Sequence, residues 1–145
     1  MFTLFTLGAL SCRSAGCIIN DFADRDIDLH VDRTKARPLT TGELSPKQAG
    51  GFLALLMALN FSILFSLPIE SIKLGLMVTP VVFLYPFTKR FFKIPQLVLG
   101  ITFNSGVMIG YAAMSAAHTV NWSVCLPFYL AGIVWTIVYD SIYAF

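Results

Sequence analysis

Long apolar runs alternate with polar connections along this chain, and the alternation predicts its elements. Five apolar segments are expected, at about 1–20, 48–67, 71–87, 96–117 and 123–145. Each is close to the roughly 20 residues that an α-helix needs to cross the hydrocarbon core of a bilayer. Polar connections separate them, two longer and two short: 21–47, 88–95, around 68–70 and around 118–122. The pattern therefore predicts an all-α fold, a multi-pass transmembrane helix bundle.

Local signals support several helix starts. Ser45 and Gln48 have the spacing of a capping box, and Pro46 between them suits the first helical position. Pro95 can open the fourth segment in the same way, and Asn121 can cap the fifth. These signals favour helices over any other element in the apolar segments.

Composition strengthens the membrane assignment. Hydrophobic residues make up 57% of the 145 positions and charged residues 12%, with a mean hydropathy of +0.75. A soluble domain of average composition carries about 25% charged residues. No basic tract with interleaved aromatic residues occurs, which argues against nucleic acid as a partner. The lipid bilayer is the expected surrounding.

Basic residues predict the orientation of the helices. They concentrate in the two longer connections, at Arg25, Arg33, Lys35, Arg37, Lys47, Lys89, Arg90 and Lys93, and the two short connections hold none. Basic residues favour the cytoplasmic side, or the matrix side in mitochondria. Five crossings then place both longer connections on that side, together with the end of the chain that carries Asp140.

An acidic run at residues 20–28 carries the candidate chemistry. If the first helix continues through it at about 100° per residue, Asp21, Asp24 and Asp28 share one face, within an arc of about 140° that also holds Asn20, Arg25 and Asp32. Asp26 points almost the opposite way. Like charges on one face repel, so a cation is expected there. Mg²⁺ suits one or two carboxylates, with water and substrate phosphates completing its shell.

Other interpretations of this run were weighed. It resembles the start of an EF-hand loop, but Leu29 and Lys35 stand where glycine and glutamate are needed, so that interpretation fails. A solvated polar helix end without any ligand stays open on spacing alone. A cation-conducting bundle is disfavoured, because the ionisable groups gather at one membrane face rather than at its midplane.

The whole pattern resembles the UbiA superfamily of intramembrane prenyltransferases. The residues that carry the resemblance are NDFADRDID at 20–28, HVDRTKARPL at 30–39, YPFTKR at 85–90, PQLVLG at 95–100, FN at 103–104 and WT with YDSIYA within 135–144. They cover nearly the whole chain in order, so the match is far more specific than any one motif. Within the superfamily it is most similar to the 4-hydroxybenzoate polyprenyltransferases of ubiquinone biosynthesis.

This resemblance implies an enzyme that moves a polyprenyl group from its diphosphate to the ring of 4-hydroxybenzoate. Asp21, Asp24 and Asp28 would be the catalytic and Mg²⁺-binding residues. The implied substrate-binding residues are Asn20, Arg25, Lys89, Arg90 and Asp140. For Lys89 and Arg90 a simpler role as topology anchors stays open. The implied location is the mitochondrial inner membrane with the acidic motif facing the matrix, and a bacterial plasma membrane is the second choice.

The family has about nine transmembrane helices, so residues 1–145 are expected to be a partial UbiA-type domain, truncated at both ends. Its activity is expected to be impaired because a second Asp-rich motif is missing. Alternatives left open are a non-catalytic or regulatory fragment that binds diphosphate and Mg²⁺, completion by pairing with a full-length enzyme or other ubiquinone-synthesis proteins, and a different acceptor such as homogentisate, naphthoate or haem.

Overall fold

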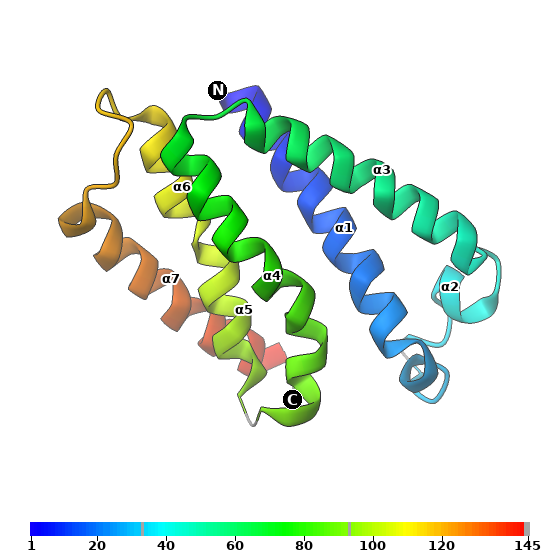
Figure 1. Cartoon of the computed structure of the whole chain (residues 1–145). Helices are drawn as coiled ribbons and strands as arrows, with labels where there is room; N and C mark the ends of the chain where they lie inside the picture. Colours follow the sequence, from blue (N-terminus) through cyan, green and yellow to red (C-terminus); the bar gives the residue numbers. More distant parts are fainter. Residues whose placement is uncertain (33, 93, 144–145) are drawn as a thin grey trace. The chain divides into compact units, whose positions relative to one another are not determined.

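The structure, a computed structural model, describes residues 1–32, 34–92 and 94–143, with the side chains of Lys89 and Arg90 outside that description. Every regular element in these residues is an α-helix: α1 (Phe2–Asp28), α2 (Pro38–Thr41), α3 (Pro46–Phe65), α4 (Ile69–Phe91), α5 (Pro95–Asn104), α6 (Gly106–Met114) and α7 (Trp122–Tyr143) (Figure 1). The chain divides into two compact units, Met1–Ile63 and Leu64–Phe145.

Five helical stretches in the described residues are long and apolar enough to cross a membrane: Phe2–Asp28, Pro46–Phe65, Ile69–Thr88, Pro95–Met114 and Trp122–Tyr143. In four of them only 11% of the most apolar window is buried inside the protein. Large apolar side chains point outward instead, such as Phe2 at 86% exposure and Phe103 at 73%. Water would solvate such a surface poorly, whereas lipid tails suit it. The predicted all-α membrane bundle is confirmed.

In the first unit, α1 and α3 run in opposite directions, with α2 at one end (Figure 1). Small buried residues lie on both helices: Ser11 and Ala15 on α1 and Ala49 on α3. The Ser11 hydroxyl donates a hydrogen bond to Asn60 Oδ1 at 2.9 Å. This polar contact ties α1 to α3 at a depth where water cannot compete for the same groups.

The predicted helix starts agree with the structure. Ser45 Oγ accepts from the Gln48 backbone N–H at 3.3 Å, and Gln48 Oε1 accepts from the Ser45 N–H at 3.0 Å. This reciprocal pair is the predicted capping box, and it precedes α3. Pro95 occupies the first turn of α5, and α7 begins directly after Asn121.

In the second unit, α7 packs most closely against α5. Gly100 of α5 lies where an added methyl group would meet Ile133 of α7 at 3.3 Å. Asn104 Nδ2 donates to the Gly100 carbonyl at 2.8 Å and to Thr136 Oγ1 at 3.0 Å. Thr136 Oγ1 in turn donates to the Gly132 carbonyl at 2.8 Å. The polar groups of this crossing therefore satisfy one another without water.

Two predicted helix ends are wrong for the same physical reason. The first and third apolar segments were expected to end near 20 and 87, but α1 continues to Asp28 and α4 to Phe91, past Pro80 and Pro86. The apolar stretch of α4 does end at Thr88. Polarity marks where a helix leaves the bilayer, whereas hydrogen bonding and capping decide where it ends. The fourth segment also departs from prediction, because it divides at Ser105 and ends at Met114.

Candidate functional site: the acidic end of α1

The acidic run occupies the last turns of α1. The first helix therefore continues through residues 20–28, as the predicted common face of aspartates requires. Asp21, Asp24 and Asp28 follow one another at intervals of three and four residues within the helix, and Asp26 is exposed. Asp32 does not extend this face, because the helix has ended before it. The Asp32 carboxylate is 97% exposed and pairs with Lys35 Nζ at 2.7 Å.

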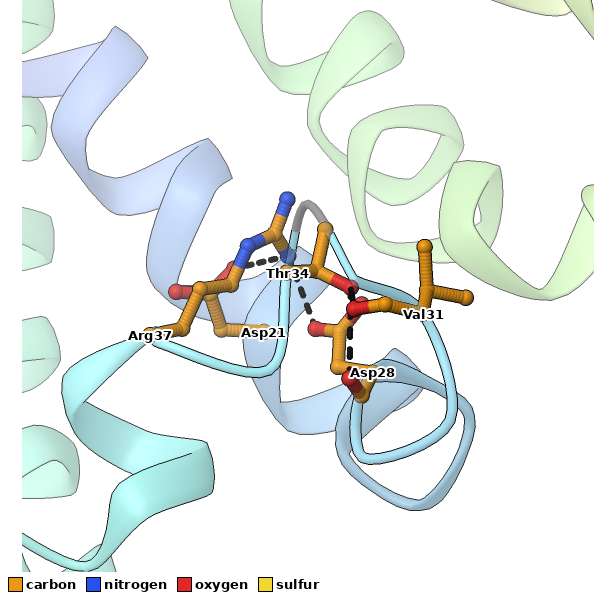
Figure 2. A network of polar contacts seen from close by, with 5 residues as sticks. All are labelled: Asp21, Asp28, Val31, Thr34 and Arg37. Carbon is orange, nitrogen blue, oxygen red and sulfur yellow. Dashed lines mark hydrogen bonds and ion pairs between the residues drawn. The ribbon is translucent and has the colours of Figure 1, made fainter.

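Arg37 bridges the two outer aspartates of the face. Its Nη1 donates to Asp21 Oδ1 at 2.7 Å and to Asp28 Oδ2 at 2.8 Å, as Figure 2 shows. The exposed fraction of the side chain is 33% for Arg37, 27% for Asp21 and 8% for Asp28. The two carboxylates therefore converge on one cationic nitrogen, and the deeper of them is almost shielded from water.

A short series of turns after the helix brings Arg37 back to it. The Thr34 backbone N–H donates to the Val31 carbonyl at 3.0 Å, and the Arg37 N–H donates to the Thr34 carbonyl at 3.0 Å. The buried Thr34 hydroxyl donates to the Asp28 carbonyl at 3.3 Å, which satisfies one of the carbonyl groups left open at the end of α1 (Figure 2).

The start of α2 fixes the direction of Arg37. Proline disfavours the helical conformation in the residue before it, and Arg37 is accordingly extended, with φ −66° and ψ 139°. Pro38 occupies the first turn of α2, and Leu39 beside it is buried at 3% exposure. The backbone on both sides of Arg37 is thus held, so its side chain starts from a defined point.

The sequence alone places Arg37 in a family-like loop and among the basic residues that predict orientation, and gives it no role in the site. The available signal was the charge balance. An acidic helix end with a buried carboxylate needs a cation nearby, because an isolated charge is costly to bury. Arginine also holds carboxylates better than lysine, because its planar fork presents several donors at once. Which of the neighbouring basic residues would return to the helix depended on the turns, and those were not predicted.

The remaining predicted site residues lie in different places. Asn20 and Asp24 are half-buried on α1, and Arg25 is exposed. Asp140 is half-buried on α7, in the second unit. The predicted roles of Lys89 and Arg90 fall on side chains outside the described residues, although their backbone belongs to the last turns of α4.

The donor set at the end of α1 suits a hard cation. All its candidate ligands are carboxylate oxygens, which Mg²⁺ prefers, and Mg²⁺ needs only one or two of them from the protein. Within residues 1–32, 34–92 and 94–143, no group of three or more His, Cys, Asp or Glu side chains is arranged to hold a metal. The geometry therefore accommodates a site of one or two carboxylates rather than a three-carboxylate cage, and the metal stays a prediction.

Comparison with known proteins gives consistent matches. The model of the UbiA prenyltransferase family matches residues 1–145. The mitochondrial 4-hydroxybenzoate polyprenyltransferase of Aedes aegypti is 50% identical over 142 residues, which cover 98% of this chain and 32% of that protein. The protein of the same name in Schizosaccharomyces pombe is 44% identical over 144 residues, covering 99% and 40%. The 4-hydroxybenzoate octaprenyltransferase of Francisella tularensis is 45% identical over 141 residues, covering 97% and 49%.

One solved structure matches closely. The apo structure of a UbiA homolog from Aeropyrum pernix superposes with a TM-score of 0.84 at 30% identity, covering 98% of this chain and 54% of that one. The chain spans from 32% to 49% of the length of the three curated relatives named above.

Proposed function

The chain belongs to the UbiA prenyltransferase family, and we propose that it serves the transfer of a polyprenyl group from polyprenyl diphosphate to 4-hydroxybenzoate in ubiquinone biosynthesis. The observation that carries this proposal is the combination of an acidic helix end at the edge of a membrane bundle with relatives of that name at 44% to 50% identity. Polyprenyl diphosphate has an apolar tail and an anionic head. The membrane bundle suits the tail, and the acidic helix end with a bound cation would suit the head.

The proposed reaction breaks one bond and forms one. The bond between the first prenyl carbon and the diphosphate oxygen breaks, and the diphosphate leaves with the electron pair. The allylic carbon forms a bond to the ring carbon next to the hydroxyl of 4-hydroxybenzoate. That ring carbon then loses its proton, and the products are prenylated 4-hydroxybenzoate, diphosphate and one proton. A bound Mg²⁺ would neutralise the charge that develops on the leaving diphosphate.

The residues of α1 receive the anionic end of the donor in this proposal. Asp21, Asp24 and Asp28 would be the carboxylates that hold Mg²⁺, and the ion would supply positive charge to the substrate diphosphate. Asn20 is the candidate hydrogen-bond donor to the diphosphate, and Arg25 places a positive charge beside it. The bundle orients the donor because the prenyl chain prefers the apolar surroundings of the helices.

The proposal gives substrate-binding roles to three further residues. Lys89 and Arg90 would hold the diphosphate or the carboxylate of 4-hydroxybenzoate, for which a guanidinium fork is well shaped. Asp140 would contribute to substrate binding from α7. Homogentisate, naphthoate and haem are competing acceptors. The names of the relatives favour 4-hydroxybenzoate.

We further propose that the acidic motif faces the matrix side of the mitochondrial inner membrane. Support comes from the basic residues of the two longer connections and from relatives named as mitochondrial. The relative from Francisella tularensis keeps a bacterial plasma membrane in second place. Pairing with a longer relative or another ubiquinone-synthesis protein also stays a prediction.

The test is a membrane assay with polyprenyl diphosphate, Mg²⁺ and labelled 4-hydroxybenzoate, run on the chain and on Asp24→Ala. Asp26→Ala is the matched control, because Asp26 lies in the same helix but is exposed and off the common face. We propose that activity is impaired, so we expect a low but detectable level of labelled prenylated product from the chain and the same level from Asp26→Ala. We expect at least a roughly hundredfold loss in Asp24→Ala, the scale on which lost electrostatic stabilisation of a transition state is felt.

Equal product from Asp24→Ala and the parent would refute the assigned role of the acidic face. Product that forms equally well after chelation of Mg²⁺ would refute the metal. No product from a stably inserted chain would refute the proposed activity of this chain and would leave its family membership intact.

A further inference from the structure

We propose that Arg37 is a positioning residue that holds the chain after α1 against the end of that helix. We also propose that Asp28 serves to hold Arg37 rather than to bind the metal. The inference rests on the proposed function in one respect only, because it narrows the carboxylates available to Mg²⁺. Its core is a clamp in which one guanidinium nitrogen joins Asp21, Asp28 and the chain that follows α1. The clamp holds Thr34 and Arg37 against the end of the helix.

Access argues against Asp28 as a ligand. Both Asp21 and Asp28 accept from Arg37, at 2.7 and 2.8 Å, but the Asp28 side chain is only 8% exposed. A magnesium ion that carries a substrate diphosphate and several waters needs open space in front of its carboxylate. Asp21 is 27% exposed, and Asp24 is half-buried rather than buried. The face therefore divides into a shielded carboxylate at its far end and more accessible ones nearer the membrane.

Charge explains why Asp28 tolerates its burial. A buried carboxylate without a partner is strongly unfavourable. Removing one partner from a buried ion pair therefore destabilises a protein far more than removing one partner from an exposed pair. Arg37 supplies the missing charge and also offsets the repulsion between Asp21 and Asp28. Lys35, by comparison, pairs with Asp32 on an exposed surface, where an ion pair contributes little. The Arg37–Asp28 pair and the Lys35–Asp32 pair thus differ in burial, and their effects on the loop can be compared by mutation.

The loop itself ties this charge to its position. Thr34 is 7% exposed and donates to the carbonyl of Asp28, and Leu39 is 3% exposed just after Arg37. Residues on both sides of Arg37 are therefore anchored in the first unit. Loss of the guanidinium is expected to release the segment between these anchors and to leave the transmembrane part of α1 unchanged.

The experiment is a double-mutant cycle on the full chain in detergent micelles with Arg37→Gln, Asp28→Asn and the pair together. Limited trypsin digestion reports loop opening through cleavage after Lys35, which is present in every variant. Trypsin does not cleave after Arg37 because Pro38 follows it, so the substitution removes no cleavage site. Asp32→Asn is the matched control, because it breaks the exposed ion pair of the same loop. Circular dichroism verifies that helix content is unchanged.

We expect each single variant to be cleaved at least about tenfold faster than the parent, because cleavage follows the population of the open loop. The double variant should be cleaved no faster than the faster single variant, since both changes break the same pair. Arg37→Lys should recover part of the protection and Asp32→Asn should match the parent. Additive effects in the double variant, or unchanged cleavage in Arg37→Gln, would overturn the clamp.

A second readout separates the clamp from the proposed metal site. Mn²⁺, added with inorganic diphosphate and followed by electron paramagnetic resonance, reports binding to the same variants. The double variant should bind Mn²⁺ within about threefold of the parent, well under the roughly 10–100-fold loss that follows mutation even of residues that support a metal site. A loss of about tenfold or more would overturn the assignment of Asp28. If Asp24→Asn leaves Mn²⁺ binding unchanged, the proposed metal site fails and the digestion alone decides the clamp.

Discussion

The crossing of α5 and α7 offers the sharpest test of packing in the second unit. A methyl group added at Gly132 would overlap Oδ1 and Cγ of Asn104. Asn104 cannot simply turn away, because its Nδ2 donates to the Gly100 carbonyl at 2.8 Å and to Thr136 Oγ1 at 3.0 Å. We therefore predict that Gly132→Ala destabilises this unit.

Three contributions set the magnitude. Overpacking of a tight site costs about 1–3 kcal/mol. An interhelical hydrogen bond within a membrane contributes about 0.6 kcal/mol on average and about 1.7 at most. Alanine is favoured over glycine within a helix by about 0.5–1 kcal/mol, which offsets part of the loss. The free energy of unfolding should therefore fall by about 1–4 kcal/mol.

Unfolding by sodium dodecyl sulfate in mixed micelles, followed by circular dichroism, would measure the change. Gly106→Ala is the matched control, because a methyl group there meets nothing within 4 Å. It should leave stability unchanged or slightly raised. If Gly132→Ala proves as stable as the control, α5 and α7 do not approach as closely as Asn104 and Gly132 indicate, and the reasoning fails.

Substitutions at three other positions test further contacts by the same unfolding assay. Ser71→Ala should cost about 1 kcal/mol, because the fully buried Ser71 hydroxyl donates to the Ile109 carbonyl at 3.0 Å; no change would mean that this bond does not tie α4 to α6. Gly42→Ala should cost about 1–2 kcal/mol, because Gly42 ends α2 at φ +83°, and Gly42→Asn should cost less. Glu70→Gln should change stability by less than about 0.5 kcal/mol, because its 2.7 Å pair with Lys73 is exposed.

The sequence predicted the membrane crossings well, because apolar length is a direct requirement of the bilayer. Ser45 and Gln48 also predicted the start of α3 through chemistry local to four residues. The ends of α1 and α4 were missed, since nothing in the polarity of the residues near 20–28 or 88–91 distinguishes a solvated helix from a loop. No proline or glycine lies within either extension.

In the candidate site, too, the features set by local helical spacing were predictable and those set by turns were not. Helical spacing alone placed Asp21, Asp24 and Asp28 on one face, and the helix does continue to Asp28. Arg37 lies nine residues beyond Asp28, and its return to the helix depends on turns around Thr34. Such turns combine several weak preferences, so the chain had five basic candidates in this connection and no local rule to choose among them. The burial of Asp28 was invisible for the same reason.

The length of α1 sets the depth in the membrane at which the acidic residues would bind an amphiphile. The helix has 27 residues, more than the roughly 20 that the hydrocarbon core requires. From Asp21 to Asp28 it rises about 10 Å, comparable with the headgroup layer, which adds about 5–7 Å on each side of the core. Under the proposed function, a polyprenyl diphosphate in the bilayer would present its anionic end at this level, with its tail among the lipids. Donors of different tail length would then meet the same carboxylates at the same depth, so recognition of the leaving group need not depend on how long the chain behind it is.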